Sequence, residues 1–290
     1  MLHKVTFIVN PHSGTGNQGL DQGIIQEYLG SDWHVDIVTT EYAGHARELC
    51  AELCNKVDVI VAVGGDGTVH EIAASLVDST TSLAIIPRGS GNGLSLFLQL
   101  PAQVKEALKV IKQSKTRRID AISINDHIFV NMAGVGFDAH IAHLFKDFGK
   151  RGFFSYGKLV LKEFSQYPGV KLNIKMNGSG ELTEEPFVVS FANSSQYGNN
   201  AHIAPGAIID DGLLDVCVVD KFPLISSCAI LLKLFTKSLN RSKYYKHYQV
   251  PEVVIQSDSD LLAHVDGEPI NIGKKATLKV IPQCINVIIP

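Results

Sequence analysis

Three glycines surround one carboxylate in the segment Gly64-Gly65-Asp66-Gly67-Thr68, a combination that can bind a phosphate chain. Glycines allow a tight turn and let backbone N–H groups approach a ligand that larger side chains would keep away. The carboxylate of Asp66 repels phosphate unless a cation lies between them. We therefore expect Asp66 to hold or orient Mg²⁺, or to transfer a proton. The alternative is a plain strand-to-helix turn in which Asp66 caps the helix.

The elements around this loop predict a parallel sheet. Apolar strand patterns at residues 5–9, 34–39, 57–63 and 83–86 alternate with helical patterns at residues 18–29, 44–55 and from the loop to residue 77. The run at residues 57–63 is almost wholly apolar, as in a strand that is buried on both faces. Alternating strands and helices favour a parallel α/β sheet, and the following helix would present its N-terminus to phosphate.

Two further polar loops follow strands of the same predicted sheet. Asn10-Pro11-His12-Ser13-Gly14-Thr15-Gly16 follows the first strand, and Pro87-Arg88-Gly89-Ser90-Gly91-Asn92-Gly93 follows the strand at residues 83–86. Ligands of open α/β sheets bind beyond the carboxyl ends of the strands, so all three loops are expected at one cleft. A Rossmann dinucleotide site is the alternative, but the third loop lacks the full fingerprint and does not follow the first strand.

The pattern changes after about residue 118, where short strands separated by turns begin. Strands are expected at residues 119–124, 127–132, 170–176, 187–192, 213–219, 253–255, 261–265, 276–281 and 285–289. Short strands of this kind indicate an antiparallel sandwich or barrel. The sequence thus predicts a nucleotide-binding α/β domain over residues 1–120 and a β-rich domain over residues 121–290.

Composition excludes several classes of protein. The chain of 290 residues is 45% hydrophobic and 19% charged, which is ordinary for a globular protein, and its net charge of -3 disfavours a nucleic-acid binder. The five cysteines are scattered without a CxxC pair, which argues against a disulfide framework or zinc ribbon and is typical of a cytoplasmic protein. No apolar run approaches the roughly 20 residues that span a bilayer.

Taken in order, the three loop motifs resemble the diacylglycerol kinase catalytic family, which includes sphingosine and ceramide kinases. They read N-P-x-S-G, G-G-D-G-T-x-x-E and P-x-G-S-G-N. The resemblance continues through Arg118-Ile119-Asp120, Gly134-Val135-Gly136-Phe137-Asp138-Ala139, Asp211-Gly212-Leu213-Leu214-Asp215-Val216 and Asp266-Gly267-Glu268-Pro269. G-G-D-G alone also occurs in NAD kinases and phosphofructokinases, so the later motifs carry the lipid-kinase assignment.

This resemblance implies a fold and a reaction. The first domain would be NAD kinase/phosphofructokinase-like, and the second a mainly antiparallel β-sandwich that binds lipid, with the last residues returning to the first domain. The enzyme would use Mg²⁺ and transfer the γ-phosphate of ATP to a lipid hydroxyl, in the expected case converting diacylglycerol to phosphatidic acid in phospholipid biosynthesis. The active site would lie in the cleft between the domains.

The resemblance also implies roles for particular residues. Glu268 would be the base that takes the proton of the lipid hydroxyl, with Asp66 and Asp120 as partners in an acidic cluster linked by water and Mg²⁺. The nucleotide contacts would be Asn10, Thr40, Gly64, Gly65, Asp66, Gly67, Thr68, Val69, His70 and Ser90.

A second, structural Mg²⁺ site would be formed by Asp211 with the backbone carbonyls of Ile208 and Leu213. The alternative interpretation of this motif is a hairpin turn without a metal, and one segment can be both a turn and a metal site. Asp138 is expected either to line the lipid side of the cleft or to cap a helix.

Some positions depart from the family pattern. Thr15 and Asn17 are neutral where simple bacterial diacylglycerol kinases often carry basic residues, and Arg88 is a candidate to supply the missing charge. The third loop is closer to the sphingosine and ceramide kinase pattern. The alternatives are therefore a sphingosine- or ceramide-type kinase, an NAD kinase, and a non-catalytic sensor of nucleotide or lipid.

Basic residues predict contact with a membrane surface. Lys233, Lys237 and Arg241 are spaced by four, which on a helix gives one basic stripe, and residues 145–162 mix aromatic and basic side chains. A solvated helix face over ordinary core residues is the alternative. We expect peripheral association with the inner membrane face from the cytoplasm, and a homodimer is left open.

Overall fold

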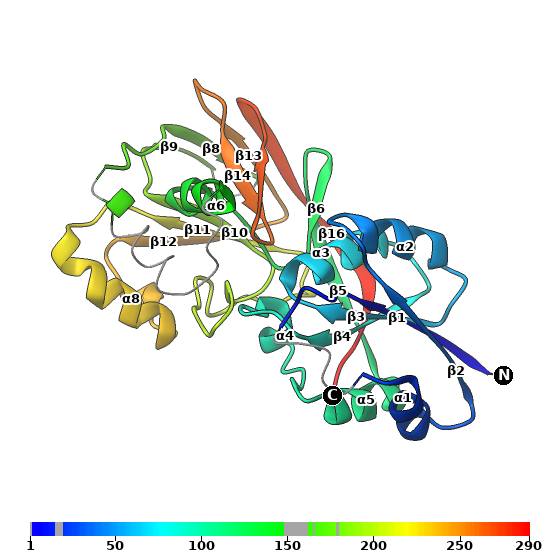
Figure 1. Ribbon diagram of the computed structural model, residues 1–290. Coiled ribbons are helices and arrows are strands. Elements are labelled where there is room, and N and C mark those ends of the chain that lie inside the picture. The colour runs from blue at the N-terminus through cyan, green and yellow to red at the C-terminus, as the bar shows by residue number, and fades with distance from the viewer. Residues whose placement is uncertain (1, 15–19, 148–161, 165, 178–179) are drawn as a thin grey trace. The chain divides into compact units, whose positions relative to one another are not determined.

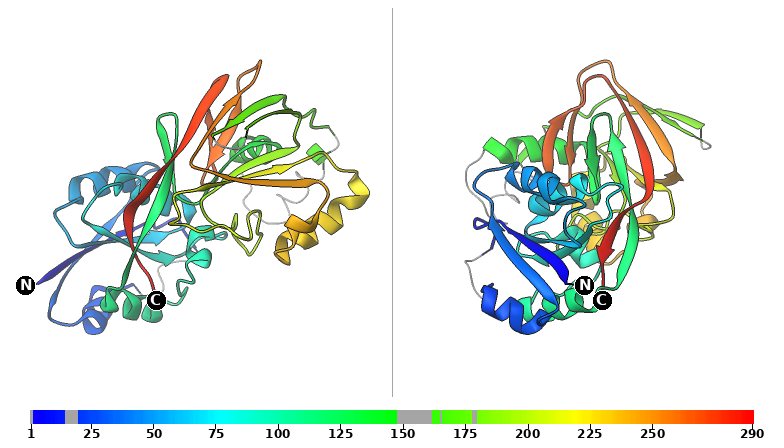
Figure 2. Two further views of the ribbon diagram at one scale, coloured as in Figure 1. Left: turned by 180° about the vertical axis from the view of Figure 1, so that it is seen from behind. Right: turned by 90° about the vertical axis from the view of Figure 1, so that its right-hand side faces the viewer.

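The computed structural model describes residues 2–14, 20–147, 162–164, 166–177 and 180–290. The chain forms two compact units, which are described separately below. The first unit comprises Met1–Ala121, Ile209–Asp211 and Ile281–Pro290, and the second comprises Ile122–Ile208 and Gly212–Val280. Both ends of the chain belong to the first unit (Figure 2). Strands β5 (Thr116–Ile124) and β16 (Lys275–Ile288) contribute residues to both units.

The first unit is built on a parallel sheet. Its strands lie in the order β2-β1-β3-β4, and the end of β16 pairs in parallel with β4 through Val287 and Leu83. The bounds are β1 (His3–Val9), β2 (Trp33–Thr39), β3 (Val59–Gly64) and β4 (Ser82–Pro87). Every residue of β3 is buried, as its apolar sequence predicts for a central strand.

Helices cover both faces of this sheet (Figure 1). Ile25 of one helix and Leu108 of another pack with Phe7 and Val61 in the core on one face, whereas Ile72 is buried on the other. The helices are α1 (Gln22–Leu29) and α5 (Val104–Gln113) on the first face, and α2 (His45–Leu53) and α3 (Asp66–Ser75) on the second. A short helix, α4 (Gly93–Phe97), follows the loop after β4. The predicted α/β domain with a parallel sheet is confirmed.

The second unit is built from antiparallel strands. Six lie in the order β12-β11-β10-β7-β14-β15, and the first part of β16 continues the order β16-β13-β8-β9. Apolar residues of both sets, such as Phe191 and Ile174, share one core. The strands are β7 (Met132–Gly136), β8 (Leu172–Met176), β9 (Gly180–Glu184), β10 (Val188–Ala192), β11 (Leu214–Val219), β12 (Tyr245–Val250), β13 (Glu252–Gln256), β14 (Leu262–Val265) and β15 (Glu268–Asn271). The predicted antiparallel β class is confirmed.

Two strand predictions were wrong. The strand expected at residues 127–132 is divided into β6 (His127–Phe129) and β7, because the carboxylate of Asp266 accepts the backbone N–H groups of Val130, Asn131 and Met132. Conversely, the strands expected at residues 276–281 and 285–289 form the single strand β16.

The helical segments of the second unit are α6 (Phe137–Asp147), α8 (Ser227–Phe235) and the single turns η1 (Leu224–Ser226) and η2 (Leu239–Arg241). The expected stripe of Lys233, Lys237 and Arg241 does not lie on one helix. The chain turns at Lys237, whose φ is 54°, directly after α8 ends. None of the helices in the described part of the chain combines the length and the apolar character needed to cross a bilayer.

Candidate active site

In the first unit, the loop of residues 64–68 and the loop of residues 87–93 touch through their glycines. A Cβ atom added to Gly89 would lie 2.7 Å from the Cα atom of Gly65, and one added to Gly65 would lie 3.1 Å from the Cα atom of Gly89. The backbones therefore approach at a distance that only glycine permits. The end of β3 and the end of β4 are thereby joined into one surface, as the positions of the two motifs predicted.

Asp66 fastens this surface. Its two carboxylate oxygens accept the backbone N–H groups of Asn92 and Gly93, each at 2.8 Å, so the first residue of α3 holds the start of α4. The third loop is closed on itself as well, because the side chain of Asn92 accepts the N–H of Gly89 at 2.9 Å and donates to its carbonyl at 2.8 Å. The carboxylate that looks anomalous in a phosphate loop thus has a positioning role.

A methyl group at Gly89 is expected to separate these loops. The Gly89→Ala side chain would collide with backbone atoms, and overpacking of this kind costs about 1–3 kcal/mol. If ATP binds to the joined loops, its Kd should rise about tenfold or more, measured by isothermal titration calorimetry. Gly206→Ala is the matched control, because a Cβ atom there meets nothing within 4 Å. Unchanged ATP affinity in Gly89→Ala would remove these loops from the nucleotide site.

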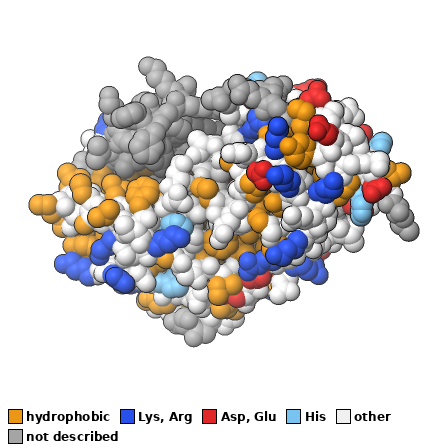
Figure 3. Space-filling model, turned by 90° about the horizontal axis from the view of Figure 1, so that it is seen from below, with side chains coloured by type: hydrophobic (Ala, Val, Ile, Leu, Met, Phe, Trp, Pro, Cys, Tyr) orange, Lys and Arg blue, Asp and Glu red, His pale blue; other side chains and the backbone are white. Residues whose placement is uncertain are grey.

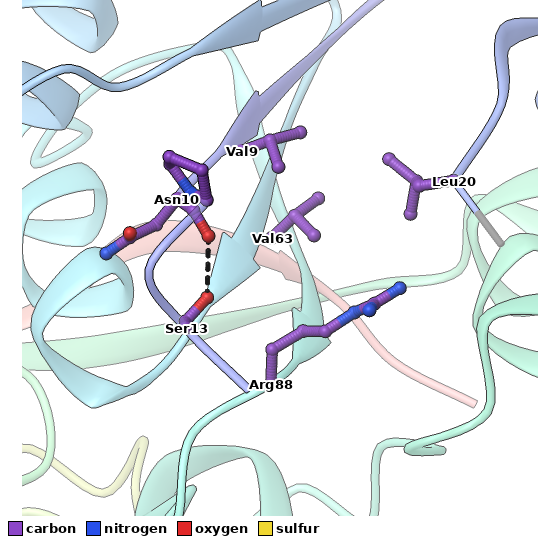
Figure 4. Close-up of a pocket in the computed structure, with 7 residues that line it drawn as sticks. Val9, Asn10, Ser13, Leu20, Val63 and Arg88 are labelled. Carbon is purple, nitrogen blue, oxygen red and sulfur yellow. Dashed lines mark hydrogen bonds between the residues drawn. The ribbon is translucent and has the colours of Figure 1, made fainter. Parts of the chain in front are cut away.

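The first loop lines a pocket beside this surface. The amide of Asn10 donates to the hydroxyl of Thr68 at 3.1 Å. The hydroxyl of Ser13 donates to the carbonyl of Asn10 at 2.8 Å, as the dashed line in Figure 4 shows. Arg88 extends along the pocket from the end of β4 towards the side where Leu20 lies. The full lining is Val9, Asn10, Pro11, Ser13, Leu20, Val63 and Arg88. The neutral residues Thr15 and Asn17 lie outside the described part of the chain.

Other residues expected at the nucleotide vary in accessibility. Thr40 follows β2, is buried, and donates its N–H to the carbonyl of Val9 at 2.9 Å. Val69 and His70 are also buried within α3, so a ligand on the loops would not reach their side chains without a rearrangement. Ser90 is exposed in the third loop.

Gly64 has a packing role of its own. A Cβ atom there would lie 2.4 Å from the hydroxyl oxygen of Thr68, the residue that Asn10 also contacts. Larger residues at position 64 would therefore displace the first turn of α3. Gly67 lies within that same turn.

Asp120 is fully buried in the first unit. Its carboxylate accepts the N–H of Gln283 at 2.6 Å, and its own N–H donates to the carbonyl of Ile209 at 2.8 Å. Gln283 has a φ of 46° and follows Pro282, and the contact with Asp120 holds β16 together at this irregular point.

Three residues before Asp120 on the same strand, Arg117 forms a bidentate ion pair with Asp210, with N–O distances of 2.7 and 2.6 Å. The hydrogen bond from the Arg117 guanidinium holds the pKa of Asp210 below its usual value. Asp210 is therefore paired with Arg117, and the adjacent Asp211 is exposed to solvent.

Glu268 begins β15 in the second unit. The turn before it has two residues with positive φ, Asp266 at 48° and Gly267 at 89°, as a two-residue hairpin of mirror-image type requires. Asp266 ties this hairpin to residues 130–132, and Glu268 itself is exposed. Asp66 and Asp120 belong to the first unit, so the predicted three-residue acidic cluster stays a prediction.

No group of three or more His, Cys, Asp or Glu side chains that could hold a metal ion occurs among the residues that the structure describes. The donors around Asp211 nevertheless have the right chemistry for Mg²⁺, since one carboxylate and the carbonyls of Ile208 and Leu213 are all oxygen ligands. Asp211 belongs to the first unit and the other two residues to the second, and this metal site stays a prediction.

A buried polar network in the second unit was not foreseen. One carboxylate oxygen of Asp138 contacts the hydroxyl of Tyr197 at 3.2 Å and Nε2 of His264 at 3.3 Å, and Ser190 contacts the Tyr197 hydroxyl. Gly134 leaves room for it, because a Cβ atom there would lie 2.3 Å from the same oxygen. Burial and the Asp138 charge raise the pKa of Tyr197 well above its ordinary value. Only Asp138 and Gly134 belong to a recognisable motif.

The fold and the joined glycine loops are compatible with a nucleotide-binding enzyme, and comparison with known proteins identifies its class. Residues 4–124 match the diacylglycerol kinase catalytic domain, and residues 131–289 match the YegS C-terminal NAD kinase beta sandwich-like domain. The chain belongs to the family of lipid kinases that carry these two domains. Membership implies ATP as the phosphate donor.

Individual relatives agree with this assignment. The protein named Probable lipid kinase YegS-like of Chromohalobacter salexigens is 32% identical over 219 residues, covering 72% of this chain and 69% of the relative. Its namesake in Yersinia enterocolitica is 28% identical over 264 residues, covering 87% and 86%. A crystal structure of a Bacillus anthracis diacylglycerol kinase has a TM-score of 0.75 and 24% identity, covering 99% of this chain and 97% of that one, which supports the fold.

Proposed function

We propose that this lipid kinase transfers the γ-phosphate of ATP to the free hydroxyl of diacylglycerol and so produces phosphatidic acid. The proposal that ATP binds here rests on the surface in which Gly65 and Gly89 touch and Asp66 holds the third loop in place. The acceptor half is supported by the relatives, which are named lipid kinases or diacylglycerol kinases.

The nucleotide phosphates would lie on the joined loops. Backbone N–H groups of the glycine-rich turns bind phosphate oxygens, and the start of α3 adds positive potential. Arg88 would supply positive charge from the pocket beside them, which offsets the neutral residues Thr15 and Asn17. Positioning and charge neutralisation of this kind account for most of the catalysis in phosphoryl transfer.

Glu268 would act as the general base. It would take the proton of the acceptor hydroxyl as that oxygen attacks the γ-phosphorus, while the bond to the β-phosphate oxygen breaks and ADP leaves. Mg²⁺, when bound, would neutralise phosphate charge, and the carboxylate of Asp66 is a suitable ligand for it. A carboxylate offers about four lone-pair sites, so two N–H groups and a cation can share it.

A sphingosine- or ceramide-type acceptor is the second candidate, because the third loop reads G-S-G-N-G. The test is to measure kcat/KM for diacylglycerol, monoacylglycerol, sphingosine and ceramide in the same mixed micelles. We expect diacylglycerol to exceed each of the others by about tenfold or more. A sphingoid lipid ranking first would replace the proposed acceptor and leave the kinase reaction intact.

A further inference from the structure

The second unit exposes an unusual group of apolar side chains at η1 and α8. Half of the ten large hydrophobic side chains exposed in the described chain lie within these twelve residues. Their exposed fractions are 58% for Leu224, 92% for Ile225, 53% for Leu231, 63% for Leu232 and 50% for Phe235. We call these five residues the α8 face. Contiguous exposed apolar side chains on a folded surface indicate a docking site.

The α8 face is exposed although the helix packs normally against the core of the second unit. Ile230 and Leu239 are buried in the core of the second unit, and Leu234 packs against the same core. The helix has therefore buried one side, and Leu231, Leu232 and Phe235 remain on the other. Their exposure is a property of the folded unit.

Basic residues flank the α8 face along the chain. From Lys221 to Pro251 the chain has six Lys or Arg residues and no Asp or Glu. Of the six, Lys246 is paired with Glu184 at 2.6 Å. Four others are exposed to solvent, namely Lys221, Lys237, Arg241 and Lys243. At the left of Figure 3, where α8 lies, hydrophobic side chains gather beside several Lys or Arg side chains.

We propose that the α8 face, with Lys221, Lys237, Arg241 and Lys243, is a docking surface for anionic phospholipid membranes. Apolar side chains would enter the boundary between headgroups and acyl chains, and the cations would contact the anionic headgroups. A second copy of this chain is a poorer occupant. In a symmetric dimer the same face meets itself, so these cations would oppose one another. The proposal goes beyond the proposed function, because it requires no particular acceptor lipid.

Vesicle sedimentation tests the surface directly. The full chain should bind vesicles of phosphatidylcholine with about 30% phosphatidylglycerol, and should bind pure phosphatidylcholine at least tenfold more weakly, because each cation contributes about 1 kcal/mol near an anionic surface. Raising NaCl from 0.05 to 0.5 M should weaken the binding, since salt screens charge. Equal binding to both kinds of vesicle would contradict the charged part of the proposal.

Two triple variants separate the charged and the apolar contributions. Lys237→Gln/Arg241→Gln/Lys243→Gln should weaken binding to anionic vesicles by about a hundredfold, from the loss of three charges. Leu231→Gln/Leu232→Gln/Phe235→Gln should weaken it by at least tenfold. The matched control is Lys105→Gln/Lys109→Gln/Lys112→Gln, which removes three exposed lysines from α5. Equal losses in the control and the first variant would reduce the effect to net charge and overturn the proposal.

An environment-sensitive dye on Cys228 reports whether α8 itself meets the lipid. Cys228 is the exposed cysteine of the five, and Cys54 can be replaced by serine to prevent a second label. Dye emission should shift to the blue when anionic vesicles are added. If the protein sediments with the vesicles but the emission spectrum of the dye does not change, the membrane contact lies elsewhere on the protein. Light scattering tests the alternative of a dimer. If the wild-type protein is a dimer that does not bind vesicles, and the apolar variant is a monomer, the α8 face would be assigned to a second copy of the chain.

Activity assays distinguish failure of this proposal from failure of the proposed function. The variants should phosphorylate a short-chain, water-soluble diacylglycerol at the wild-type rate and long-chain diacylglycerol in anionic vesicles at least tenfold more slowly. Vesicle binding without activity on either lipid would contradict the proposed acceptor and leave the docking surface intact. Full activity of both triple variants on vesicles, with unaltered binding, would contradict the docking surface alone.

Discussion

Glu268→Gln is expected to lower kcat by about a thousandfold while leaving the Kd of ATP within about twofold. The substitution keeps the size of the side chain and removes the group that would accept the proton of the lipid hydroxyl, and general bases contribute about 10²–10⁴ in rate. Glu268 is exposed at the start of β15, so its loss should not disturb the core. Single-turnover kinetics and calorimetry measure the two quantities separately.

Glu185→Gln is the matched control, because Glu185 is another exposed carboxylate of the second unit. It should retain the wild-type kcat. A loss of ATP affinity in Glu268→Gln that matches the loss of kcat would show that Glu268 serves nucleotide binding. Wild-type turnover in Glu268→Gln would remove it from the reaction.

Asp66→Asn is expected to lower turnover by about a hundredfold or more. The amide keeps the shape of the carboxylate, but its NH2 group is a donor. It would face the backbone N–H of Asn92 or Gly93, which is also a donor, so that this hydrogen bond is lost. An unsatisfied group of this kind costs about 1–3 kcal/mol. The variant would also lose the charge that we propose for holding Mg²⁺. Steady-state kinetics over a Mg²⁺ titration gives the size of the effect.

Glu71 offers an unusually close control for Asp66. It lies on the same helix, and its carboxylate also accepts two backbone N–H groups, from Gly44 at 2.9 Å and Arg47 at 3.3 Å. Glu71→Gln should destabilise the fold to a similar degree, seen in thermal melts, and change turnover by no more than about threefold. Equal turnover losses in the two variants would restrict Asp66 to a positioning role.

The α/β class of the first unit could be predicted from the sequence, because its signals are local. The apolar strand at residues 57–63 and the glycines after it specify a buried strand and a turn without reference to any distant residue. The role of Asp66 could not be predicted in the same way. Its partners, Asn92 and Gly93, lie 26 and 27 positions along the chain, and only the packing of two strand ends brings them together.

The same limit applies in the second unit. The sequence gives no sign that Asp266 would interrupt a strand at Val130 and Asn131, 136 and 135 positions away. Around α8 the run of leucines with Phe235 is equally compatible with a core helix and with a surface one. Which side is exposed depends on how Ile230 is buried, and that is a tertiary property. The aromatic and basic segment at residues 145–162 lies almost wholly outside the described part of the chain.

Transfer of radiolabel from γ-labelled ATP tests the central claim most directly. The purified protein is incubated with labelled ATP, Mg²⁺ and, in separate reactions, diacylglycerol vesicles or NAD, with Glu268→Gln alongside. The account predicts label in phosphatidic acid, none in NADP, and about a thousandfold less product from the variant. Label in NADP alone, or no transfer to any lipid from a protein that binds ATP, would contradict it.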